Sequence, residues 1–228
     1  MATKEKDTNK ELEVEEIVSK SEQFIENNSK KIIYGIIALA LVVGAILGFK
    51  HGYLIPQEKK ASAAMFRGEQ YFAQDSFNIA LNGNGADFEG FEAVIDQYGS
   101  TSTGNLAKGY AGICYYKLGD YEKASDMLKS FDPNEKMISP TFIGTIGDCY
   151  ANMGNLKEGI SYFEKAAKRA SNSVVSPSYL MKAGRAYENL KQYGDAIKVY
   201  TTIKEKYYGT QEASEVDKYI TRASVLNK

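Results

Sequence analysis

Side chains able to perform chemistry are scarce in this chain of 228 residues. It has one histidine, His51, and two cysteines, Cys114 and Cys149. One histidine cannot supply a multi-histidine metal centre, and two cysteines alone cannot complete a structural zinc site. His51 stands beside Lys50 at the end of an apolar segment and has no evident orienting partner in the sequence. We therefore interpret His51 as an interfacial residue rather than a general base.

Motifs for nucleotide binding or nucleophilic catalysis do not compensate for this scarcity. The sequence has no G-x-x-x-x-G-K-[ST] phosphate loop and no G-x-S-x-G elbow. Its 28 Lys and Arg residues balance 29 Asp and Glu residues, which disfavours nucleic-acid binding. We therefore expect no cofactor, no metal and no nucleic acid partner. An enzyme is the least favoured class, and a protein that acts through protein partners is the most favoured.

An apolar segment runs from Ile32 to Phe49 without one charged residue, between Lys30-Lys31 and Lys50. As a helix it would measure about 27 Å, close to the roughly 30 Å core of a bilayer. A buried core helix and a cleaved signal peptide are the alternatives. The long polar stretch before the segment and the absence of a cysteine soon after it disfavour a signal peptide. We expect an uncleaved signal anchor, with a transmembrane helix over residues 32–54.

One face of this expected helix carries small residues at every fourth position. Such a stripe lets a second membrane helix approach closely, although small residues are common in membrane helices generally. The basic residues on the two sides of the segment are too similar in number to set its orientation. The packing candidates are Ala40, Gly44, Gly48 and Gly52.

Residues 1–31 form the tail before the span. The first ten, MATKEKDTNK, have the polar composition of a disordered segment. The rest predicts a helix whose apolar face includes Val14, Ile17, Phe24 and Ile25. Its polar face is acidic, whereas a membrane-surface helix usually carries Lys and Arg there. Docking to a protein or simple solvation is therefore as compatible with this helix as lipid binding.

After the span the sequence repeats itself. Three stretches begin at Gly112, Gly147 and Gly184, offset by 35 and 37 residues. In each, a tyrosine follows three residues after the glycine, a small residue after twelve, and a bulky apolar residue after sixteen. These positions hold Tyr115, Tyr150 and Tyr187, then Ala124, Gly159 and Ala196, then Leu128, Phe163 and Tyr200.

The repeated pattern resembles the signature of the tetratricopeptide repeat (TPR) family, whose period is about 34 residues. The small residues would let the two helices of a repeat cross closely, and the larger ones would fill the gaps. Pro133, Pro140 and Pro177 fall near repeat boundaries, where proline starts a helix well. The family's tryptophan is absent, since Lys108, Ile143 and Leu180 stand in its place.

The resemblance implies a TPR-like solenoid of about four helix pairs. Together with the apolar segment, this predicts an all-α chain in which a single N-terminal transmembrane helix precedes the solenoid. We expect three repeats over residues 105–209 and a capping helix over 210–228. Residues 55–104 read as a divergent first repeat with a long first helix from about Pro56. Gly68 and Tyr71 match the repeat pattern, which is then interrupted at Asn82-Gly83-Asn84-Gly85. Its second helix is predicted over Asp87 to Gln97.

The resemblance also indicates which side chains face the concave groove, where TPR proteins bind their partners. The set is mixed polar and aromatic, and it lacks the Lys/Asn-rich group with which some family members clamp a C-terminal carboxylate. Cys114 and Cys149 occupy one repeat position and would lie about 10 Å apart, beyond disulfide reach, so we expect two free thiols. The groove candidates are Ile113, Tyr116, Lys117, Asp148, Asn152, Arg185, Glu188 and Asn189.

The whole layout is similar to the YfgM-like family, ancillary subunits of the bacterial Sec protein translocon. The similarity spans Glu15 to Asn227 and includes the segment FIENNSKKI before the span. It implies a single-pass protein of the bacterial inner membrane, with a cytoplasmic N-terminus and periplasmic repeats. It implies the translocon, envelope chaperones or emerging client polypeptides as partners, and lipid contact through Ile32–Phe49. A tethered scaffold for outer-membrane biogenesis or cell division is the alternative function.

Overall fold

The computed structural model describes residues 2–132 and 139–228, with side chains from residue 24 onward. The described residues form helices and no strands, and helix accounts for 82% of the structure. This confirms the predicted all-α class. The chain divides into two compact units, Met1–Pro56 and Gln57–Lys228.

The first unit is helical throughout its described length. Helix α1 spans Ala2–Phe49 and a π-helical turn, η1, spans Lys50–Leu54. Because α1 begins at Ala2, the disorder predicted for the first ten residues is wrong. One helical stretch, Phe24–Ala73, is long and apolar enough to cross a membrane, with a mean hydropathy of 2.7 in its most apolar window. No part of that window is buried, so it is not a core helix of the described residues.

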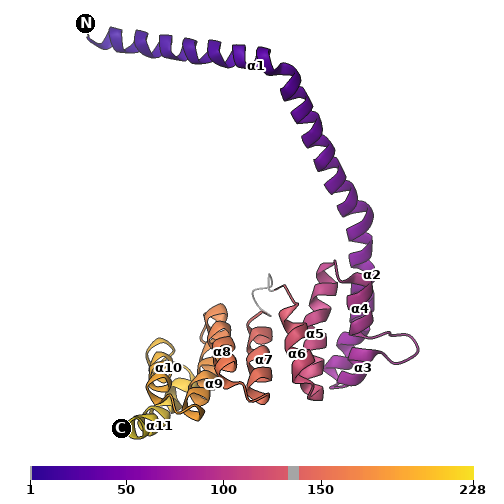
Figure 1. Cartoon of the computed structure of the whole chain (residues 1–228), viewed down its shortest axis with the longest axis vertical. Helices are drawn as coiled ribbons and strands as arrows, with labels where there is room; N and C mark the ends of the chain where they lie inside the picture. The colour runs from indigo at the N-terminus through magenta and orange to yellow at the C-terminus, as the bar shows by residue number, and fades with distance from the viewer. Residues whose placement is uncertain (1, 133–138) are drawn as a thin grey trace. The chain divides into compact units, whose positions relative to one another are not determined.

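The second unit is built from helices that alternate in direction along the chain (Figure 1). From α3 onward, helices adjacent in sequence pack against each other, which is the arrangement of a solenoid. We call the helix that opens each repeat its first helix and the one that follows its second helix. After α2 (Ile55–Ala73), α3 (Phe77–Asn82) and α4 (Phe91–Tyr98) come α5 (Ser102–Leu118), α6 (Tyr121–Lys129), α7 (Ser139–Asn152), α8 (Leu156–Ala170), α9 (Ser176–Asn189), α10 (Tyr193–Lys206) and α11 (Gln211–Leu226).

Glycine sets the close crossing of the two helices within each repeat. A Cβ atom added to Gly147 would lie 2.7 Å from the ring of Phe163, sixteen residues later. Gly112 meets Leu128 and Gly184 meets Tyr200 in the same way. The bulky residue of each second helix therefore occupies the space that a first-helix side chain would need, as the sequence spacing predicts.

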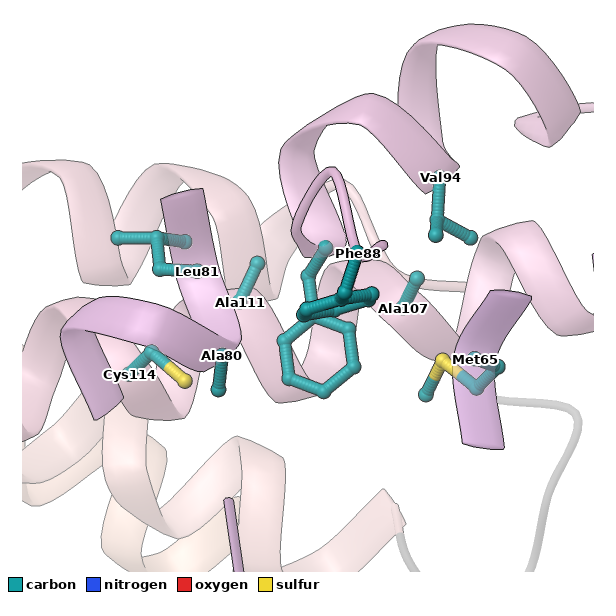
Figure 2. Packing of buried hydrophobic residues seen from close by; sticks show 9 residues of the cluster. Met65, Ala80, Leu81, Phe88, Val94, Ala107, Ala111 and Cys114 are labelled. Carbon is teal, nitrogen blue, oxygen red and sulfur yellow. The ribbon is translucent and has the colours of Figure 1, made fainter. Parts of the chain in front are cut away.

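The divergent first repeat differs from expectation in its second helix. The helix predicted over Asp87 to Gln97 begins only at Phe91, as α4. The side-chain oxygen of Asn84 accepts hydrogen bonds from the backbone N–H groups of Ala86, Asp87 and Phe88, so these amides close a loop instead of starting a helix. The loop still buries Phe88 in a core that joins α2 to α5. Figure 2 shows this core, with Met65, Ala80, Leu81, Phe88, Val94, Ala107, Ala111 and Cys114.

Repeated hydrogen bonds establish that α4 is nevertheless the second helix of a repeat. The Tyr115 hydroxyl donates to Glu92 on α4, and the Tyr187 hydroxyl donates to Glu164 on α8 at 3.0 Å. Both pairs are separated by 23 residues. At the other end, Val216 and Ala223 of α11 pack with the buried Tyr200 and Ile203, so α11 covers the last repeat.

Candidate protein-binding face

The eight groove candidates lie on three first helices. Ile113, Tyr116 and Lys117 belong to α5, Asp148 and Asn152 to α7, and Arg185, Glu188 and Asn189 to α9. We call these eight residues the first-helix face. Lys117, Asn152, Arg185 and Asn189 are exposed, and the other four are partly buried.

Most of the charges on this face are paired with the next first helix. Asp148 on α7 binds the ammonium of Lys182 on α9 at 2.7 and 2.8 Å. Arg185 on α9 donates to the hydroxyl of Tyr219 on α11 at 3.0 Å. Each pair is separated by 34 residues, one repeat period. The face is therefore partly a ladder that holds successive repeats together.

Glu188 makes the tightest connection of this ladder. Its carboxylate accepts two hydrogen bonds from the guanidinium of Arg222, at 3.0 and 2.5 Å, and one from the hydroxyl of Tyr200 at 3.0 Å. The hydrogen bonds that Arg222 donates to Glu188 are the main cause that raises the pKa of Arg222. Burial is the main cause that raises the pKa of Tyr200. Glu188 thus joins α9, α10 and α11 and is not free to bind a partner.

Sequence reasoning identifies one member of each pair and misses the other. Lys182, Tyr219 and Arg222 are not among the candidates, although each lies 34 residues after a candidate. The repeat period itself could have found them. Which residue of the next helix pairs with which was not predictable, because this depends on how neighbouring helices are shifted along their axes.

The three candidates on α5 differ in how accessible their side chains are to a binding partner. Ile113 packs against the apolar cluster of Leu128 and Phe142, so it belongs mainly to the core. Burial, followed by the charge of Asp148, raises the pKa of Tyr116. The ammonium of Lys117 lies 5.9 Å from the centre of the Phe77 ring.

Amide groups are the most available part of the face. The amide nitrogen of Asn152 donates to the Asp148 carbonyl at 2.8 Å. Asn189 forms no side-chain hydrogen bond with the described residues, and it is exposed. Asn152, Asn189 and Lys117 therefore offer donors and acceptors of the kind that hold a polypeptide backbone.

The two thiols are placed for packing rather than reaction. Cys114 and Cys149 are both free and fully buried, which confirms the predicted absence of a disulfide. Burial raises the pKa of each thiol to about 12. A thiol in that state is neither nucleophilic nor a metal ligand at neutral pH. In the described part of the chain, no three His, Cys, Asp or Glu residues gather into a group that could hold a metal ion.

The small-residue stripe of the apolar helix is open to its surroundings. Ala40, Gly44, Gly48 and Gly52 are all exposed. A Cβ atom added to any of the three glycines would have no neighbour within 4 Å. None of the described residues therefore packs on this stripe, and the packing role of these residues stays a prediction.

Comparison with known proteins identifies the repeats. Family models of the tetratricopeptide repeat match residues 110–132, 141–173 and 178–207. A search of curated proteins finds no significant match. Among solved structures, a Podosopora anserina putative kinesin light chain with nearly identical TPR-like repeats is 13% identical with a TM-score of 0.51, over 75% of this chain and 85% of that one. A single-substitution variant of the same protein gives the same values.

A third solved structure, the MamA protein, is 16% identical with a TM-score of 0.49, over 73% of this chain and 91% of that one. At these identities the two kinesin light chain structures show the fold alone. Proteins built from this repeat are typically non-enzymatic scaffolds. Residues 110–132, 141–173 and 178–207 of this chain are tetratricopeptide repeats, which indicate an adaptor for protein–protein interaction.

Proposed function

We propose that this protein is a membrane-anchored, non-enzymatic TPR adaptor of the bacterial inner membrane that assists the Sec translocon. The observation that carries the proposal is one chain that joins an exposed, membrane-length apolar helix to tetratricopeptide repeats. In this proposal the N-terminus is cytoplasmic and the repeats are periplasmic. The partners are the translocon itself, envelope chaperones or emerging envelope proteins. The similarity in layout to translocon subunits supports this choice over another envelope assembly.

The first-helix face would bind these partners weakly and with little selectivity for charge. Its strongest charges are neutralised within the ladder, as the Asp148–Lys182 and Glu188–Arg222 pairs illustrate. The amides of Asn152 and Asn189 remain for hydrogen bonds to an extended polypeptide. Anchoring to the membrane raises the local concentration of the face near the translocon, which turns a weak contact into an effectively intramolecular one.

Site-specific photocrosslinking in cells tests where the partner binds. A photoreactive amino acid replaces Asn189 on the first-helix face, and in a second chain it replaces Ser161 on α8. Both positions are exposed and form no side-chain hydrogen bond with the described residues, so neither replacement disturbs the fold. We expect protein adducts, including translocon subunits, from Asn189 and few from Ser161. Equal adducts from both positions would contradict binding along the first-helix face.

The stripe of the anchor is tested separately. Replacing both Gly44 and Gly48 with Leu keeps the helix apolar but blocks close approach of another helix. We expect co-purification of a membrane partner to weaken, while membrane insertion of the variant is unchanged. Unchanged recovery of the partner would mean that the span is only a tether.

A further inference from the structure

Among the described residues of 57–132 and 139–228, the two most exposed large apolar side chains lie in equivalent loops. Tyr208, between α10 and α11, is 86% exposed, and Val174, between α8 and α9, is 80% exposed. They lie one repeat period apart along the chain. Exposing an apolar side chain to water is unfavourable, and a repeated occurrence at one site of the solenoid suggests that something covers both.

Both loops hold these side chains outward by well-defined contacts. The side-chain oxygen of Asn172 accepts from the backbone N–H groups of Val174 and Val175 at 3.0 and 2.9 Å. In the second loop, Tyr207 is buried while its neighbour Tyr208 is not. The Thr210 hydroxyl then accepts from the backbone of Ala213 and caps α11. The exposed positions are thus fixed by the loops and are not frayed ends.

These loops belong to one edge of the solenoid, where the first helices begin; we call it the start edge. Ser173 and Tyr208 line the same surface hollow, of about 510 Å³, so the two loops are neighbours. Earlier in the stack, Glu58 near the start of α2 accepts from the backbone N–H groups of Ser102 and Thr103 at the start of α5. Because the helices alternate in direction (Figure 1), every first helix begins on this side.

The chain enters the repeat unit at the same edge. Gln57 is the first residue of that unit, and Phe49 ends the apolar segment eight residues before it. Even fully extended, those residues span no more than about 29 Å. If the apolar helix crosses a bilayer, the start of α2 stays close to the lipid headgroups.

Charge on the start edge favours an anionic surface around the first loop. The last turn of α8 carries Lys168 and Arg169, and the last turn of α10 carries Lys204 and Lys206. The helix dipole favours cations at the C-terminal end of a helix, so these basic residues alone are not unusual. The dipole also favours an acidic residue in the first turn of the following helix, but the first turn of α9 contains none. Lys204 pairs with Asp217, and Glu205 and Glu212 lie near the second loop. The basic excess is therefore centred on Lys168 and the α8–α9 loop.

We propose that the start edge rests on the anionic bilayer to which the chain is anchored. Val174 and Tyr208 enter the headgroup region, where tyrosine is favoured, and Lys168 meets lipid phosphates. This proposal rests on the membrane anchoring proposed above. It gives the repeats a fixed orientation on the membrane, with the opposite edge directed away from it.

Fluorescence quenching in a reconstituted bilayer tests this orientation. The full chain is placed in vesicles containing phosphatidylglycerol and phosphatidylcholine, with a quencher attached to the lipid headgroups. Single cysteines carry the fluorophore at Val174→Cys or Tyr208→Cys. Met153→Cys is the matched control, because Met153 is also an exposed apolar residue, 42% exposed, but lies between α7 and α8 at the opposite edge. Cys114 and Cys149 are fully buried and do not react in the folded protein.

We expect quenching at positions 174 and 208 to exceed that at 153 by about threefold or more, and the excess to shrink in pure phosphatidylcholine. Quenching no stronger than at 153 would overturn the proposal and favour a protein occupant of this edge. A fluorophore at Leu47→Cys in the apolar segment, read with quenchers along the lipid tails, separates the two claims. Quenching there without quenching at 174 and 208 overturns only the start-edge contact. No quenching at 47 overturns both this contact and the anchor.

Discussion

Side-chain size at a few glycine positions decides whether the helices of this solenoid can pack. Gly144 of α7 illustrates this, because a Cβ atom there would overlap the ring of Tyr179 on α9. Gly194 of α10 is also helical, but the nearest atom to its added Cβ is the Asn227 side chain, 3.8 Å away. The same residue type thus has a packing role at one site and none at the other.

This contrast predicts opposite effects of one substitution. Gly144→Ala should lower the free energy of unfolding by about 1–3 kcal/mol, because Tyr179 must move. Gly194→Ala should raise it by up to about 1 kcal/mol, because alanine is the better helix former and has room. Urea unfolding of both variants in detergent measures the two changes. A loss of equal size at both sites would contradict the packing described here.

The partly buried hydroxyl of Tyr187 should make the free energy of unfolding depend on pH in the alkaline range. Burial, and then its hydrogen bond to Glu164, raises the pKa of its hydroxyl from 10.0 to about 12. The folded state therefore holds this proton more tightly than the unfolded state. The resulting stabilisation is complete below pH 10 and is lost as the pH rises towards 12. Tyr187→Phe should flatten the fall in unfolding free energy over this window, and an unchanged slope would refute the assignment.

At the scale of elements, the sequence predicts most of the repeats and misplaces one helix. The spacing of glycine, tyrosine and small residues is enough to predict helices α5 to α10, because each of these positions makes a local contact between two helices. Apolar periodicity begins at Phe88, so the sequence predicts that α4 starts at Asp87, whereas the helix starts at Phe91. The competing signal is the side chain of Asn84, which holds the following amides in a loop.

Helix α11 is predicted to be essential for the last repeat. A chain that ends at Gly209 would expose Tyr200 and Ile203, which are now fully buried, and would leave Glu188 without Arg222. Each large apolar side chain contributes about 1.5–3 kcal/mol when buried. We expect a lower melting temperature and aggregation by light scattering. A chain that lacks only Asn227 and Lys228, both exposed, should melt like the full protein. If the chain that ends at Gly209 melts at the same temperature as the full chain, α11 does not cap the last repeat.

At the scale of the whole molecule, a membrane-length helix is joined to an adaptor domain. The sequence predicts this division because hydropathy and repeat period are properties of long segments and do not depend on side-chain detail. It could not predict which side chains pair across the candidate face, since the pairing depends on how neighbouring helices are shifted along their axes. What the face binds is likewise not encoded in any motif that the chain contains.

The most direct measurement of the central claim is the yield of photocrosslinked partner from position 189 in three chains. One has the native Ile32–Phe49, one an unrelated membrane span, and one a cleavable secretory signal in place of the span, which delivers the repeats to the same compartment without a tether. We predict the same partner from the first two, at a lower yield from the unrelated span because it lacks the stripe of Gly44 and Gly48. The third should give a yield lower by about a hundredfold, because tethering supplies the local concentration. A yield that does not depend on the span, or no adduct from any chain, would contradict a membrane-tethered adaptor.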